Sequence, residues 1–189
     1  MKDGLAFAVE NLRLKETAIV AELNHPAFDD FITFLRSQGY ESLYEFVADL
    51  DEERAYKILN LHLRRPFPEE IVLFDGIARP YSQDAAKWNL VGWIFRDAPT
   101  QRLRPMVASM PGTDVIARKA RILNVVRLFA STVFPAPEKW TWVVVSEVVI
   151  DRLEGSRRAI KGSLFEAIVR RHLTAIFADS GLPLTVSDA

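Results

Sequence analysis

The carboxylate Glu166 lies in the segment of this sequence that is best suited to chemistry. Residues 156–181 read SRRAIKGSLFEAIVRRHLTAIFADSG, and their apolar residues recur at steps of three and four, which predicts one broad buried stripe on a helix. Glu166 falls at the edge of this stripe, where a side chain can point into a cleft. One interpretation of Glu166 is therefore an accessory catalytic group or a metal ligand. The residues of the stripe are Phe165, Ile168, Val169, Leu173, Ile176 and Phe177.

A structural role for Glu166 competes with that interpretation. Ser163 and Glu166 have the S-x-x-E spacing of a capping box, in which the serine side chain bonds a backbone amide and the glutamate bonds the amide of the capping residue. Glu166 also precedes Arg170 by about one helical turn, which suits an ion pair along the helix. The sequence alone leaves both interpretations open.

Basic residues in three segments are candidates for contacts with double-stranded DNA. One group precedes the helix that carries Glu166, where a helix N-terminus already attracts phosphate. A second group accompanies Trp93 and Phe95 in a proline-rich stretch, and a third follows one side of a predicted helix over residues 114–131, which we expect to be exposed. Guanidinium groups pair with phosphates and with guanine edges. The candidates are Arg157, Arg158, Lys161, Arg96, Arg102, Arg104, Arg118 and Arg121, and Lys119 and Arg127 share the side of the third group.

The charge distribution agrees with a polyanionic partner for the later part of the chain. Residues 1–60 contain 6 Lys and Arg against 12 Asp and Glu, whereas residues 61–189 contain 18 against 13. The alternative is that both regions are solvated faces of one domain.

Several common catalytic sites are excluded by composition. The chain contains no Cys, so thiolate metal sites and cysteine nucleophiles are absent. Its three histidines are far apart and have no metal-ligand spacing. Neither a G-x-S-x-G elbow nor a glycine-rich phosphate loop occurs.

The acidic run over residues 49–53 is interpreted as an exposed turn and a first helical turn, where carboxylates interact favourably with the positive end of the helix dipole.

The remaining composition predicts a globular, mainly α protein. The 189 residues are 49% hydrophobic and 26% charged, which suits one core-forming domain. Neither a signal peptide nor an apolar run of membrane-spanning length is evident, so we expect a cytoplasmic protein. We divide the chain into a helical N-terminal region, residues 1–135, with an irregular aromatic and arginine-rich middle, and a helical entry to a catalytic core, residues 136–189.

Apolar periodicity and capping signals predict several helices and a few short strands. Pro26 and Gly39 delimit one helix, Thr113 is the expected N-cap of the helix over 114–131, and Gly155 is expected to end the helix before Glu166. The other predicted helices cover residues 5–23, 42–50 and 53–63. The predicted strands are residues 71–74, 88–95 (or a helical turn) and 184–186. Residues 140–153 are predicted as a helix, with a strand over 140–145 as the alternative.

The segment around Glu166 resembles a known family. Its basic lead-in, Gly162, a helix carrying Phe165 and Glu166, the following Val169 and a later strand resemble the entry to the catalytic core of type II restriction endonucleases of the PD-(D/E)XK superfamily. The resemblance implies an α/β nuclease that uses Mg²⁺ to hydrolyse DNA, with Glu166 as an accessory group, and a homodimer suited to palindromic DNA.

The chain departs from this family at the catalytic strand. No E-x-K occurs, because no acidic residue is followed two positions later by Lys. The resemblance then implies that the chain is the N-terminal part of a longer endonuclease and is inactive alone. The alternative hypothesis is a non-catalytic helical module that binds DNA or another protein.

Overall fold

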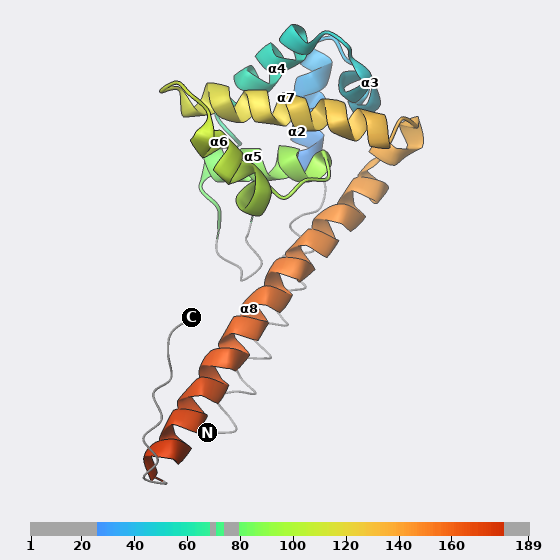
Figure 1. The fold of residues 1–189 in the computed structure, drawn as a ribbon. Coiled ribbons are helices and arrows are strands. Elements are labelled where there is room, and N and C mark those ends of the chain that lie inside the picture. The colour runs from blue at the N-terminus through green and yellow to red at the C-terminus, as the bar shows by residue number, and fades with distance from the viewer. Residues whose placement is uncertain (1–25, 69–70, 74–79, 180–189) are drawn as a thin grey trace.

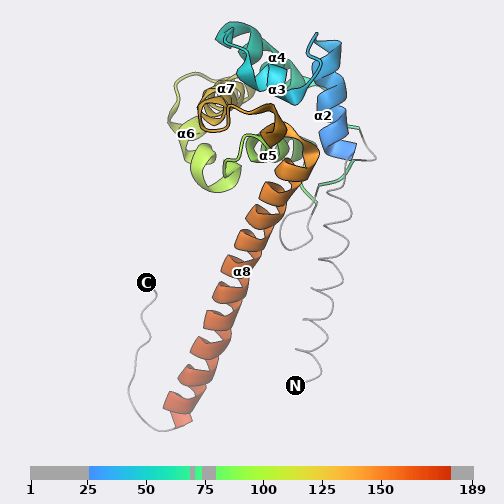
Figure 2. The same ribbon diagram turned by 90° about the vertical axis from the view of Figure 1, so that its right-hand side faces the viewer.

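The computed structural model describes residues 26–68, 71–73 and 80–179, and its fold is mainly α, as predicted. Helix α7 runs through a compact body, with α3 and α4 on one side and α5 and α6 on the other, while α2 crosses behind α7 in the view of Figure 1 and α8 projects from the body (Figures 1 and 2). The elements are α2 (Pro26–Ser37), α3 (Leu43–Ala48), α4 (Glu52–Arg64), α5 (Gln83–Ile94), the π-helical turn η1 (Pro99–Leu103), α6 (Arg104–Ser109), α7 (Val115–Val133), the 3₁₀ turn η2 (Pro137–Trp140) and α8 (Trp142–Asp179).

Polar side chains begin the helices of the body where the sequence supplies caps. The Ser42 hydroxyl accepts a hydrogen bond from the Glu45 amide at 3.2 Å, and the Asp51 carboxylate accepts one from the Arg54 amide at 2.9 Å. These contacts satisfy backbone donors that have no partner inside the helix. The N-cap of α7 is Asp114 rather than the predicted Thr113, because the Asp114 carboxylate accepts from the Ala117 amide at 3.0 Å.

Aromatic side chains from separate helices form the centre of the body. Phe31 of α2 and Phe46 of α3 are fully buried and meet edge to face, with ring centroids 6.2 Å apart. The ring centroid of Phe95, which follows α5, lies 6.4 Å from that of Phe46. Each buried phenylalanine contributes about 1.5–3 kcal/mol of transfer free energy. Phe28, Phe34 and Leu35 of α2 are also buried, whereas Ile32 is half-buried.

Arg127 of α7 is buried, although the sequence predicts it on an exposed side. Its Nη1 donates to the backbone carbonyls of Phe46, Val47 and Asp49 at 3.0, 2.9 and 2.7 Å, and its Nε donates to Asn124 Oδ1 at 2.9 Å. The carbonyls at the end of α3 have no partners within that helix. Burial lowers the pKa of Arg127, but an arginine in a protein stays charged, so it closes α3 as a cationic C-terminal cap.

Lys87 of α5 performs the same role for α4. Its side chain is buried, and Nζ donates to the carbonyls of Leu63 and Arg65 at 2.7 and 2.6 Å. Asp84 lies 3.7 Å from Nζ, one turn earlier on α5. Burial lowers the pKa of Lys87, and Asp84 opposes that shift.

The strand predicted over residues 71–74 does not form in its described part, whereas the helical alternative for residues 88–95 and the helix predicted from residue 140 are confirmed. Residues 88–95 belong to α5 and the residue after it, and the 140–145 segment enters α8. Within residues 71–73 and 80–81, pairing is limited to an isolated bridge, in which the Tyr81 amide donates to the Leu73 carbonyl at 2.8 Å. The predicted helix over 5–23 and strand over 184–186 lie outside the described residues.

Helix α8 contradicts two predictions for the Glu166 segment. It runs unbroken from Trp142 to Asp179, so Gly155 does not end it and Ser163 is not an N-cap. An internal glycine costs only about 1 kcal/mol relative to alanine, which does not terminate a long helix. The stripe predicted to be buried is also wrong, because Phe165 and Ile176 are 69% and 60% exposed.

Candidate anion-binding site

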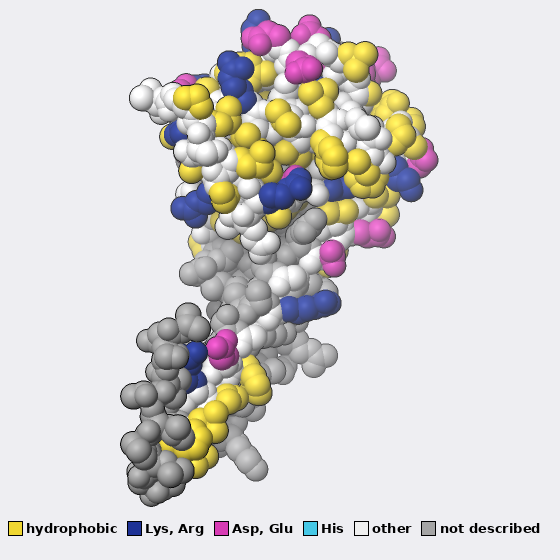
Figure 3. Space-filling model, in the orientation of Figure 1, with side chains coloured by type: hydrophobic (Ala, Val, Ile, Leu, Met, Phe, Trp, Pro, Cys, Tyr) yellow, Lys and Arg dark blue, Asp and Glu magenta, His cyan; other side chains and the backbone are white. Residues whose placement is uncertain are grey.

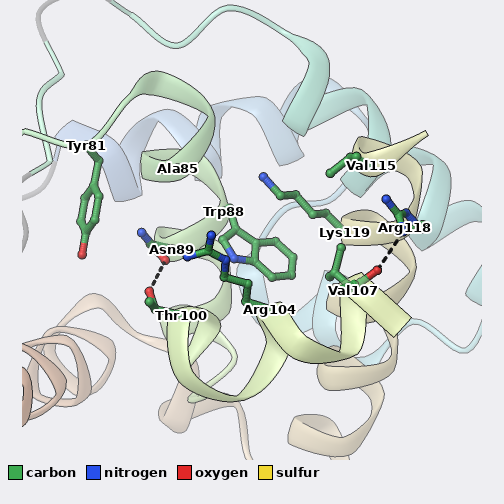
Figure 4. Close-up of a pocket in the computed structure, with 11 residues that line it drawn as sticks. Tyr81, Ala85, Trp88, Asn89, Thr100, Arg104, Val107, Val115, Arg118 and Lys119 are labelled. Carbon is green, nitrogen blue, oxygen red and sulfur yellow. Dashed lines mark hydrogen bonds between the residues drawn. The ribbon is translucent and has the colours of Figure 1, made fainter. Parts of the chain in front are cut away.

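A cavity of about 520 Å³ lies between α5, α6 and α7, and η1 closes one side of it (Figure 4). Its walls combine an indole ring, a buried amide, two hydroxyl groups and three cationic side chains. None of the lining side chains is a carboxylate. The lining residues are Tyr81, Ala85, Trp88, Asn89, Thr100, Arg104, Val107, Ala108, Val115, Arg118 and Lys119.

Arg104 and Lys119 are the cations available to a ligand. Arg104 begins α6 and is exposed, and its guanidinium group lies toward Asn89 and Trp88 (Figure 4). The Lys119 ammonium lies 5.7 Å from the centroid of the Trp88 ring, within cation–π range. Neither cation forms an ion pair with a carboxylate among the described residues. The cavity therefore has positive charge that the body does not neutralise.

Arg118 shapes the cavity from within the protein. Its Nη1 donates to the carbonyls of Val107 and Met110 at 3.1 and 3.0 Å, which closes the end of α6. Its Nε is buried and has no hydrogen-bond partner among the described residues. Asp114, one turn before Arg118 in the chain, pairs with Arg64 of α4. Arg118 thus holds α6 against α7 and adds charge to the cavity wall.

Asn89 and Trp88 supply the polar and aromatic parts of the wall. Both belong to α5 and are buried, with 3% and 6% of their surface exposed. The Asn89 Oδ1 accepts a long hydrogen bond of 3.5 Å from the Thr100 hydroxyl, while the amide nitrogen makes no hydrogen bond to a described residue. The Asn89 amide N–H groups are therefore available to an acceptor in the cavity.

The wall formed by η1 depends on Gly92 of α5. A Cβ atom at this position would lie 2.2 Å from Cγ of Pro99, closer than atoms can approach. Glycine thus lets η1 pack directly on α5, and the chain then continues into α6. This contact places Thr100 and Arg104 at the cavity.

The structure separates the DNA-contact residues predicted in the proline-rich stretch. Arg102 forms two hydrogen bonds to the buried Asp97, through Nε at 2.8 Å and through Nη2, and these contacts raise the pKa of Arg102. Arg96 donates to the Lys139 carbonyl, and its guanidinium carbon lies 4.2 Å from the ring centroids of both Phe134 and Trp140. Both arginines therefore stabilise the fold, and only Arg104 of that group lines the cavity.

The other predicted site residues are dispersed. Arg121 lies over the Tyr56 ring at 4.4 Å, and Arg158 is exposed on α8. The side chains of Arg157 and Lys161 lie outside the described part. Glu166 is exposed, and its Oε1 lies 3.3 Å from Nη2 of Arg170, which confirms the predicted ion pair.

The predicted candidates Arg104 and Arg118 thus meet at one site with Lys119, whereas Trp88 and Asn89 were missed. The polar Asn89 between the apolar residues Trp88 and Leu90 was the available signal, because buried amides need partners. Within residues 26–68, 71–73 and 80–179, no three His, Asp or Glu side chains come close enough to hold a metal ion.

Comparisons with protein-family models, with curated proteins and with solved structures found no match for this chain. None of the described helices combines the length and apolar character needed to cross a membrane.

Proposed function

We propose that this protein binds nucleic acid without catalysing a reaction on it, and that the cavity between α5, α6 and α7 holds a phosphate group. The observation that supports this function is the set of three cations around the cavity, with no carboxylate in its lining. Phosphate contacts provide most of the affinity in non-specific nucleic-acid binding.

Each polar wall has a distinct role in this proposal. The exposed guanidinium group of Arg104 can donate two parallel hydrogen bonds to a phosphate, whereas Lys119 acts as a point charge. Arg118 adds positive electrostatic potential to the cavity while its guanidinium group donates to the carbonyls at the end of α6. Trp88 and the Asn89 amide offer an aromatic surface and two donors to the sugar or base next to that phosphate.

Salt dependence provides the direct test. A fluorescein-labelled DNA duplex would be titrated with the protein at several salt concentrations, and binding would be followed by fluorescence anisotropy. The one phosphate held in the cavity contributes about −1 to the slope of the logarithm of the binding constant against the logarithm of the salt concentration, and loss of that contact removes this contribution. Arg104→Glu and Lys119→Glu should each weaken binding and flatten this slope.

Arg36→Glu is the matched control, because Arg36 is exposed on α2 and does not line the cavity. The proposal fails if duplex and single-stranded DNA both show no binding at low salt. It also fails if the control weakens binding as much as Arg104→Glu. Competition by a mononucleotide at the same concentration as DNA would instead assign the cavity to a small anionic ligand.

The endonuclease hypothesis is a separate proposal for a longer protein that includes an E-x-K strand. Under this hypothesis the longer protein would be cytoplasmic, and this chain would supply contacts with DNA. Glu166 would support a Mg²⁺ site formed mainly by residues of the rest of that protein. Glu166→Gln in that longer protein tests the idea: unchanged Mg²⁺-dependent cleavage would leave Glu166 with only its ion pair to Arg170.

A further inference from the structure

One face of α8 carries an unusual series of residues along most of its length. The members follow one another at steps of three and four, so they lie on the same side of the helix. The distal members Phe165, Leu173 and Ile176 are 69%, 43% and 60% exposed, and hydrophobic side chains are visible along the projecting end of α8 (Figure 3). The face comprises Asp151, Gly155, Arg158, Gly162, Phe165, Val169, Leu173 and Ile176.

The same face begins in a groove at the base of α8. This groove, of about 940 Å³, lies between α7, α8 and the segment that includes Arg96 and Arg102. Phe129 of α7 belongs to its apolar floor and is 61% exposed. Asp151 lines the groove and is about four helical turns before Phe165. The groove and the apolar stripe are therefore the two ends of one face. The apolar lining residues are Phe129, Val133, Phe134 and Val148.

We propose that a second copy of this chain covers this face, with the two α8 helices antiparallel and Gly162 of each copy at the two-fold axis. In this register, residues equally distant from Gly162 face one another. Val148 at the base of one copy then faces the partner's Ile176, and Asp151 faces the partner's Leu173. The apolar distal end of each α8 thus enters the groove at the base of the other.

Charge complementarity selects this register and orientation. Arg158 and Glu166 are equally distant from Gly162 on opposite sides, so each arginine faces the partner's glutamate. In a parallel arrangement, Arg158 would face the same cation of the partner, and the groove would stay open. Opposite charges that face one another across an interface fix its register.

The glycines and the length of the face suit close packing of two helices. A Cβ atom added to Gly155 or Gly162 would meet no atom within 4 Å, so neither glycine is required by contacts within one copy. Small residues on facing helices allow a close approach of their backbones. The face from Asp151 to Ile176 is about 38 Å long, and a stable dimer buries about 800 Å² on each partner.

Cysteine cross-linking tests the arrangement cleanly, because the chain has no native Cys. Under mild oxidation, Gly162→Cys should form a covalent dimer, since a disulfide needs Cα atoms within about 7 Å. Asp151→Cys and Leu173→Cys should each remain mostly monomeric when alone and should cross-link when mixed. Ser109→Cys, on the exposed side of α6, is the control that should not cross-link.

Charge reversal tests the register without oxidation. Sedimentation equilibrium should give a dimer for the wild type. Arg158→Glu and Glu166→Arg should each weaken the dimer by at least tenfold, whereas the double variant should regain most of the affinity, because the opposite charges face one another again. A wild-type monomer at 100 micromolar (roughly the level needed to detect weak dimers), self-linking of Asp151→Cys, or no recovery in the double variant would each overturn the proposal.

Discussion

In the body formed by α2 to α7, the cationic residues Arg127 and Lys87 are only 0% and 2% exposed, whereas on α8 Phe165 and Ile176 are 69% and 60% exposed. Each region therefore contains an exception to the usual positions of side chains: charged groups inside the apolar core of the body, and apolar groups on the surface of α8. In the body, each buried cation donates to carbonyls at the end of another helix. Burial of a cation is tolerated where such partners satisfy its donors. On α8, the exposed apolar face indicates a surface for association rather than a core.

Replacement of Arg127, the buried cation of α7, should have the largest effect on the stability of the body. Arg127→Ala removes the donor to the carbonyls of Phe46, Val47 and Asp49 and leaves a cavity. We expect the free energy of unfolding to fall by about 3–5 kcal/mol, as when one partner of a buried charge interaction is removed. Urea denaturation followed by circular dichroism measures the change. A Phe165→Ala control on α8 should change the stability of the body by less than about 0.5 kcal/mol.

The buried histidine of α4 gives an intermediate effect that depends on pH. Burial, aided by the positive charges of Arg65 and Lys87, holds the pKa of His62 well below its usual value. The unfolded chain binds a proton below about pH 6.5 that the folded protein does not bind. This contribution to stability is complete above that pH and is lost as the pH falls.

The expected loss from His62 is at most about 1.4 kcal/mol per pH unit. Urea denaturation at pH 7 and at pH 5.5 measures it, and His62→Gln provides the comparison because glutamine does not titrate. The difference between the two pH values should be smaller for this variant than for the wild type. Equal differences would show that His62 is protonated in the folded protein.

The smallest expected effect is that of a substitution at Gly155 on the stability of α8. Gly155 lies inside the helix, is exposed and has no atom within 4 Å of an added Cβ. Gly155→Ala should therefore increase the helical content of α8 and stabilise it by about 0.5–1 kcal/mol. Thermal melting followed by circular dichroism at low protein concentration measures this change. A decrease in helix stability would mean that Gly155 is required by a contact within one copy.

Local signals in the sequence were sufficient to predict much of the body. Pro26 and Gly39 delimit α2 as expected, and Gly39 has a positive φ of 89°, which favours glycine. Asp51 begins α4, which confirms the interpretation of the acidic run as a turn and a first helical turn. These features depend on residues close together in the chain, where capping and backbone preferences decide the outcome.

Features that depend on distant parts of the chain were predicted poorly. Arg127 is buried because the end of α3 supplies carbonyl acceptors, and nothing in the sequence of α7 indicates that contact. Phe129 has apolar neighbours on α7 but faces a groove. At the candidate site, Arg104 and Arg118 were predicted from their charge, whereas Trp88 and Asn89 depend on the packing of η1 against α5. Helical periodicity places residues on a face without showing what that face meets.

Cationic side chains that cap a neighbouring helix couple the unfolding of separate helices in the body. Arg127 and Arg118 of α7 close α3 and α6, and Lys87 of α5 closes α4. Unwinding of α7 would therefore expose carbonyls at the ends of two other helices at once. Amide hydrogens in the last turns of α3 and α6 should exchange with solvent together with those of α7, as one cooperative unit. The short helices α3 and α6 thus persist only as long as α7 remains folded.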